Sequence, residues 1–204
     1  MAGVRITESS LSINPIIPKS WLSYRFQIRY QNIPLLIAVT QTNTELKSFP
    51  AVYQNHKKDI YNGLKEGKTK LIKYEKLNMI FPGFREPVGM KIGFKKFCRD
   101  FGFNHTVYAE FKDRKIKKGE VYIIPDDRDL VNVIEKSKQQ DLILGVDFGI
   151  ISYNETTLKK VVENGITTIS TDFVAMGKIL AQMILNGKKE QIENKCTLII
   201  RKSL

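Results

Sequence analysis

Three short polar turns each follow an apolar stretch of the chain, at residues 82–85, 125–128 and 153–155. Together they offer cations, carboxylates, an amide and a phenol. A carboxylate accepts hydrogen bonds from adjacent hydroxyls, while Arg and Asn donate in fixed geometry, so this set suits a polyhydroxylated ligand. The candidate ligand-binding residues are Arg85, Asp126, Asp127, Arg128, Tyr153 and Asn154.

A purely structural role is the alternative for the last of these turns. Asn154 and Glu155 are residue types that make turns, and Thr156 or Thr157 could cap the helix that follows. Position in the sequence does not separate the two roles, so both stay open here.

The elements that would position these turns alternate between strand and helix. Continuous apolar runs predict buried strands at residues 34–40, 77–81, 120–124, 148–152 and 166–171, with a further strand at 105–111. Helices are expected from Asn55, over 86–101, over 127–138, from Thr156 and from Asp172. In the second of these, Met90, Phe94, Phe97 and Phe101 fall on one helical face, which we expect to be core.

This alternation favours a parallel sheet with helices on both faces, that is, an α/β fold. Ligands of open α/β sheets bind outside the carboxyl ends of the strands. We therefore expect the tips that follow Phe81, Ile124 and Ser152 to converge on one cavity.

Composition narrows the class of protein. With 204 residues, 42% hydrophobic and 26% charged, the chain can form one domain or two small lobes. No apolar run reaches the ~18–20 residues of a membrane span, and the first twenty residues do not resemble a signal peptide, so we expect a cytoplasmic protein. The net charge of +12 is spread over several lysine-rich stretches, which favours solvated helix faces over a nucleic-acid surface.

Catalytic and cofactor chemistry lack a sequence signal. Cys98 and Cys196 lie far apart, and neither His56 nor His105 has ligand spacing with them, so we predict no metal. No G-x-S-x-G elbow, G-x-G-x-x-G or Walker fingerprint is present. We therefore predict no cofactor and no enzymatic activity.

The stretch GIISYNETTLKKVVENGITTISTDFVAMGKILAQMIL at 149–185 resembles the effector-binding domain of lactose-repressor-type regulators. Its most specific features are Thr167-Thr168, Asp172-Phe173 and Met176-Gly177. The ending LIIRKSL is similar to the Arg-x-Ser ending of that group. With VYQNHKKDIYNGL, REPVGMKIGFKKFC and EVYIIPDDRDL, the pattern also resembles the sugar-sensing domains attached to GntR-type DNA-binding heads. The resemblance covers about residues 34–204.

The resemblance implies a periplasmic-binding-protein-like fold of type I, with two parallel-sheet lobes and an effector, a sugar or sugar phosphate, in the cleft between them. Asn154 takes the place of the family's ligand-binding carboxylate or amide, and Asp126 and Asp127 match its polar pair. The arginine that many members place before the helix glycine is missing here, because Met90 stands before Gly93. Homodimers, and DNA binding through an N-terminal head, are implied as well.

The resemblance also implies a division of the chain. Residues 50–165 with 196–204 would form the second lobe, and 13–49 with 166–187 an incomplete first lobe, after an irregular tail at 1–12. Two βα units and the DNA-binding head do not fit into residues 1–33, so we expect a fragment or truncated product. A stand-alone sugar-binding protein of transport or chemotaxis and a small α/β enzyme are the alternatives.

Overall fold

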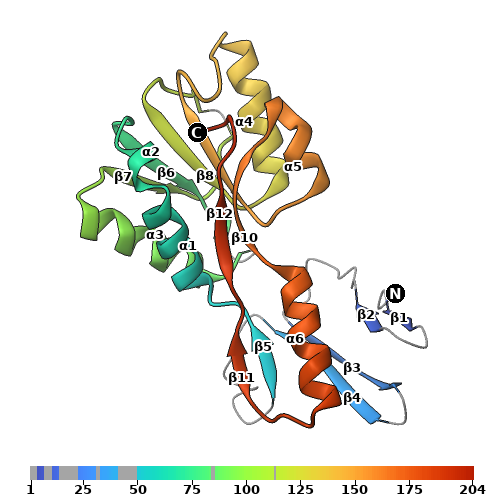
Figure 1. The fold of residues 1–204 in the computed structure, drawn as a ribbon. Coiled ribbons are helices and arrows are strands. Elements are labelled where there is room, and N and C mark those ends of the chain that lie inside the picture. The colour runs from blue at the N-terminus through green and yellow to red at the C-terminus, as the bar shows by residue number, and fades with distance from the viewer. Residues whose placement is uncertain are drawn as a thin grey trace. The chain divides into compact units, whose positions relative to one another are not determined.

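The computed structural model describes residues 50–83, 86–112 and 114–204, and before them the strands at 4–6, 11–13, 23–30 and 33–40. The chain divides into two compact units (Figure 1). Unit 1 comprises Met1–Tyr53 and Phe173–Glu193, and unit 2 comprises Gln54–Asp172 and Asn194–Leu204. Among the described residues no helix is long and apolar enough to cross a membrane.

Unit 2 is built on a six-stranded sheet with the order β12-β10-β9-β8-β6-β7. All neighbours in it run parallel except β12, which is antiparallel to β10. Its strands are β6 (Lys76–Ile80), β7 (His105–Tyr108), β8 (Glu120–Ile124), β9 (Gly149–Tyr153), β10 (Thr167–Thr171) and β12 (Cys196–Ile199). Every residue of β8, β9 and β10 is buried, as expected for strands covered on both faces.

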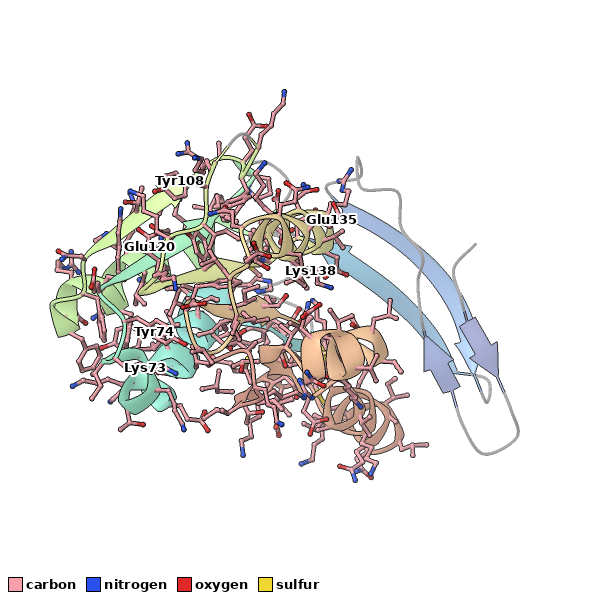
Figure 2. All side chains as sticks on the ribbon, turned by 90° about the horizontal axis from the view of Figure 1, so that it is seen from above. Lys73, Tyr74, Tyr108, Glu120, Glu135 and Lys138 are labelled. Carbon is pink, nitrogen blue, oxygen red and sulfur yellow. The ribbon has the colours of Figure 1, made fainter. Side chains whose placement is uncertain are left out.

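Helices cover both faces of this sheet (Figure 1). One face carries α1 (His56–Glu66), α2 (Lys68–Leu71) and α3 (Val88–Phe101); the other carries α4 (Asp127–Gln139), α5 (Thr157–Val161) and the 3-10 helix η3 (Val162–Asn164). In Figure 2, Lys73 and Tyr74 lie on the α2 side and Glu135 and Lys138 lie on α4.

The two core clusters follow from the alternation of side chains along the strands. Val121 and Ile123 of β8 join the cluster under α1 and α3, whereas Tyr122 and Ile124 join the cluster under α4. The aromatic stripe of α3 packs in the first cluster, so the prediction that it forms core is confirmed. The predicted α/β class, with a parallel sheet between helices, is confirmed as well.

Unit 1 contains a short parallel pair and two antiparallel hairpins. The parallel pair is β5 (Ala51–Tyr53) with β11 (Gln191–Glu193), and α6 (Phe173–Leu185) belongs to the same unit. The hairpins pair β1 (Val4–Ile6) with β2 (Leu11–Ile13) and β3 (Ser23–Tyr30) with β4 (Ile33–Thr40).

Three features of the predicted division differ in the structure. The strand predicted at 34–40 exists as β4, but it pairs antiparallel with β3 rather than in a parallel lobe. The strand predicted at 166–171 exists as β10, but it pairs with β9 in the sheet of unit 2 instead of joining the first lobe. The tail at 1–12 contains β1 and the start of β2. An apolar run predicts a buried strand without specifying its neighbour, which explains the first two differences.

The carboxyl-terminal residues are anchored in unit 2. The Ser203 hydroxyl donates to the carbonyl of Ile150 at 2.8 Å and accepts from the amide of Thr167 at 2.7 Å. Leu204 is buried in the cluster under α1 and α3. These contacts give the Arg-x-Ser ending a structural role.

Both thiols of the chain are expected to be inert in the native protein. Burial raises the pKa of Cys98 and of Cys196 to about 12, and the thiolate is the reactive form. At pH 8 we expect Ellman's reagent to label neither cysteine in native protein and both in concentrated guanidinium chloride. Rapid labelling of the half-buried Cys196 in the native state would contradict its raised pKa.

Candidate functional site

The candidate site is the carboxyl edge of the unit 2 sheet. β8 pairs in parallel with β6 on one side and with β9 on the other. Parallel neighbours end at the same edge of a sheet, so the tips after Phe81, Ile124 and Ser152 lie along one edge. That they enclose one cavity stays a prediction. Arg85, the candidate on the first tip, lies outside the described residues.

At the tip of β8, Asp126 caps the amino end of the helix that follows, α4. Its carboxylate accepts from the amide of Arg128 at 2.8 Å and is the N-cap of α4. Asp126 is 6% exposed, whereas the Arg128 side chain is 60% exposed. Of the two adjacent aspartates, Asp127 is the one that reaches solvent, with a side chain 67% exposed.

At the end of β9, Tyr153 is held by two side chains of α1. Its hydroxyl donates to Asp59 at 3.1 Å, and Nδ1 of His56 lies 3.1 Å from the same oxygen. Burial and the charge of Asp59 raise the pKa of Tyr153, and burial lowers the pKa of His56. Both groups are therefore neutral near pH 7.

Sequence reasoning missed His56 and Asp59 because they lie more than ninety residues before Tyr153. Their spacing in the sequence could have indicated that they act together, because His56 and Asp59 are at positions i and i+3 of the first turn of α1 and therefore share a face. The tip of β9 and the start of α1 thus form one buried polar cluster.

Asn154 has an unusual backbone and an unfilled acceptor. Its φ of 59° lies in the left-handed region, which Asn tolerates better than most residues. Its amide donates to the carbonyl of Ile169 on β10 at 2.9 Å. Its side-chain oxygen Oδ1 is buried and has no hydrogen-bond partner among the described residues. A buried acceptor left open in this way is a reason to expect a ligand or water there.

Glu155, the next residue, is occupied within the protein. Arg201 binds its carboxylate through both terminal nitrogens, at 2.9 and 3.0 Å, and Thr168 donates its hydroxyl to the same carboxylate. Burial acts to raise the pKa of Glu155, but these hydrogen bonds outweigh it, so that the pKa lies below its usual value. The residues that carry the family resemblance, Thr168 and Arg201, therefore fix the tail of the chain to this turn.

Next to β10, the carboxyl edge includes the residues at which the two parts of unit 2 begin or end, namely Gln54, Asp172 and Asn194. The amide nitrogen of Gln54 donates to the Thr171 hydroxyl, and Asn194 donates to the carbonyl of Asp172 at 2.9 Å. Asn194 is 4% exposed, and its Oδ1 also has no partner in the described part of the chain. Sequence reasoning did not single out Gln54 or Asn194.

A recess of about 540 Å³ lies at the opposite, amino edge of the sheet, lined in part by Lys76, His105 and Glu120. Glu120, which Figure 2 labels on β8, is buried and accepts from Asn78 at 2.8 Å and from Tyr122 at 2.6 Å. The recess is separate from the candidate site, because the two lie at opposite ends of the strands. Among the described residues no three His, Cys, Asp or Glu side chains cluster in a way that could hold a metal ion.

Residues 4–51 match the family model of the C-terminal domain of glycosyl hydrolase family 65. A stretch of 45 residues of the chain is 47% identical to alpha,alpha-trehalose phosphorylase of Geobacillus stearothermophilus. That alignment spans 22% of this chain and 6% of the enzyme. The match overlaps the start of the region, about 34–204, that resembles the regulators.

The solved structures similar to this chain include regulators of the lactose-repressor type. A ribose operon repressor of Lactobacillus acidophilus aligns with a TM-score of 0.62 and 14% identity, over 77% of this chain and 65% of that one. The lac repressor bound to ONPG aligns at 0.62 and 13%, over 79% and 55%. The regulator CelR in complex with cellobiose aligns at 0.58 and 10%, over 78% and 55%.

Our chain thus spans less than two thirds of each of these three regulators. At such identities the alignments establish the fold. The chain has the periplasmic-binding-protein-like α/β fold that these effector-binding regulators share.

Proposed function

We propose that unit 2 is the larger part of the effector-binding domain of a bacterial transcriptional regulator and that a small polar molecule, a sugar or sugar phosphate, binds at its carboxyl edge. The observation that carries this proposal is the buried Oδ1 of Asn154, an acceptor without a partner among the described residues, on the tip of β9 and on the same edge as the tips of β8 and β6. The structural neighbours crystallised with ONPG and with cellobiose support a sugar as the ligand class.

Each candidate residue has a definite part in this proposal. A sugar hydroxyl would donate to Asn154, while Asp127 and Arg128 would accept from and donate to neighbouring hydroxyls. Asp126 and Tyr153 would hold the two tips in place, because both are buried and bonded within unit 2. Arg85 would supply a second cation from the tip of β6.

The regulatory consequence follows from population shift. An effector changes the equilibrium between two conformations only by its differential affinity for them. The proposed regulator is a cytoplasmic homodimer. In it the conformational change would reach DNA through a GntR-type DNA-binding head, which is not among the described residues. We base this function on residues 54–204, since the phosphorylase-like segment represents a small fraction of that enzyme.

Thermal unfolding tests the ligand class and the site together. We expect at least one compound among ribose, maltose, cellobiose and glucose 6-phosphate to raise the unfolding midpoint of the full chain. At a concentration of 100 times Kd the stabilisation is about 2.7 kcal/mol, or roughly 5–10 °C. The shift should be clearly smaller in Asn154→Ala, which loses one hydrogen bond to the ligand, and should persist in Asn132→Ala, which removes an exposed amide from α4.

Two outcomes would contradict the proposal. If none of the four compounds shifts the wild-type midpoint, the sugar class is wrong. If a compound shifts wild type and Asn154→Ala equally, it binds elsewhere and the carboxyl edge loses its assignment.

A further inference from the structure

Lys159 is a buried lysine at the centre of the candidate site. It lies on α5 and is 3% exposed. Its ammonium nitrogen lies 2.8 Å from the carbonyl oxygen of Tyr153, 3.1 Å from that of Asn154, and 2.8 Å from Oδ1 of Asp127. An ammonium has three donors, so these three acceptors use its full capacity.

The three contacts join two tips of the sheet. Asp127 follows β8, whereas Tyr153 and Asn154 end β9. Asn154 is thereby held at both ends of its backbone, since its amide donates to β10 and its carbonyl accepts from Lys159. With the backbone fixed in the left-handed region, the direction of the Asn154 side chain is fixed as well.

We propose that Lys159 is the positioning residue of the ligand-binding edge. It sets the spacing between Asp127 and Asn154, and it holds Asn154 in the conformation in which its buried Oδ1 has no partner among the described residues. Being buried, Lys159 acts through these two residues and does not touch the ligand. The inference rests on the proposed function, because it assumes that Asn154 binds a ligand.

The choice of residue supports a role beyond packing. Burying an ammonium requires desolvation, and replacing a whole buried ion pair by hydrophobic side chains is often neutral for stability, so packing alone does not require a lysine here. Asp127 is mostly exposed, so it stays hydrated if Lys159 is removed. Replacing Lys159 leaves the carbonyls of Tyr153 and Asn154 without this donor, so we expect it to change the geometry of the tips and to lower stability as well.

The test compares Lys159→Met with Lys160→Met, which removes the exposed neighbouring lysine. In the ligand-free full chain, we expect the amide of Asn154 to exchange hydrogen at least about tenfold faster in Lys159→Met, with the amides of β8 unchanged. The affinity for whichever of ribose, maltose, cellobiose and glucose 6-phosphate binds wild type should weaken about tenfold or more. Lys160→Met should match wild type in both measurements.

A double variant separates positioning from a general structural role. If Lys159 acts through Asp127 and Asn154, Lys159→Met should weaken binding clearly less in an Asn154→Ala background than it does in wild type. Additive losses, or wild-type affinity in Lys159→Met, would overturn the inference. If Lys159→Met does not fold, Lys159→Gln, which keeps one donor group, replaces it in the same comparison.

Failure of the proposed function gives a different result. In that case no compound binds wild type, and hydrogen exchange at Asn154 still decides whether Lys159 holds the turn. Unchanged exchange in Lys159→Met would show that it does not.

Discussion

Replacing Arg201 with methionine is expected to lower the free energy of unfolding of unit 2 by about 3 kcal/mol, the lower end of the range for breaking a buried ion pair. The Arg201 and Glu155 side chains are only 18% and 17% exposed. Arg201 also donates to the carbonyl of Ile166 at 2.7 Å. Methionine would fill part of the volume but leave the Glu155 carboxylate and this carbonyl without their donors. Urea denaturation followed by circular dichroism measures the loss.

A pH series identifies the ion pair as the cause. The pKa of Glu155 is depressed in the folded state, so its contribution is fully present above the usual glutamate pKa of 4.5 and is lost as the pH falls through the folded value. The stability difference between wild type and Arg201→Met should therefore shrink below about pH 4.5. Lys202→Met, at an exposed neighbouring position, should change stability by less than about 0.5 kcal/mol. A difference that is constant with pH would assign the loss to packing instead.

Most of the unit 2 fold could be predicted from the sequence because its strands are covered on both sides. Residues 120–124 and 148–152 are apolar runs bounded by turn residues, and such runs predict buried strands directly. Parallel pairing then places their tips on one edge without further information. The candidate edge was therefore predictable from the order of strands and helices.

The roles of individual side chains on that edge were not predictable. Glu155 lies one residue after Asn154, yet it binds Arg201, which is 46 residues away in the chain. In the sequence, Lys159 is indistinguishable from a solvent-exposed helix lysine. Only the structure shows that it contacts Tyr153 at the end of β9 and Asp127 after β8. Whether a polar side chain faces a ligand or another part of the protein depends on such distant contacts.

In unit 1 the sequence predicted a strand but not its pairing partner. The run at 34–40 predicts a strand, but nothing in it specifies an antiparallel neighbour. The signal lay in the preceding residues, where Tyr24, Phe26, Ile28 and Tyr30 alternate with polar residues in the period of a half-exposed strand. In the register of the hairpin, the apolar Phe26 and Ile28 lie opposite Ile37 and Leu35. An alternating strand of this kind is typical of antiparallel sheets, so it argues against the prediction that this segment belongs to a parallel lobe.

Replacing Gly93 with alanine is expected to destabilise unit 2 by about 2–3 kcal/mol, although alanine is the better helix former. Within an isolated helix the change would be favourable by about 1 kcal/mol. Gly93, however, lies in α3 where α1 crosses it, and a Cβ there would lie 2.2 Å from the carbonyl oxygen of Lys57. Backbone atoms cannot yield like a flexible side chain, so the two helices must separate and the core beneath them loosens.

The matched control is the same substitution at Gly177 in α6, where no atom of the described side chains and backbone lies within 4 Å of the added Cβ. Alanine there should stabilise the helix by about 0.5–1 kcal/mol, because only propensity acts. Opposite signs for the two variants in urea denaturation would show that close helix packing, rather than glycine as such, decides the outcome. Equal stabilisation in both would mean that α1 and α3 do not approach each other as closely as the structure places them.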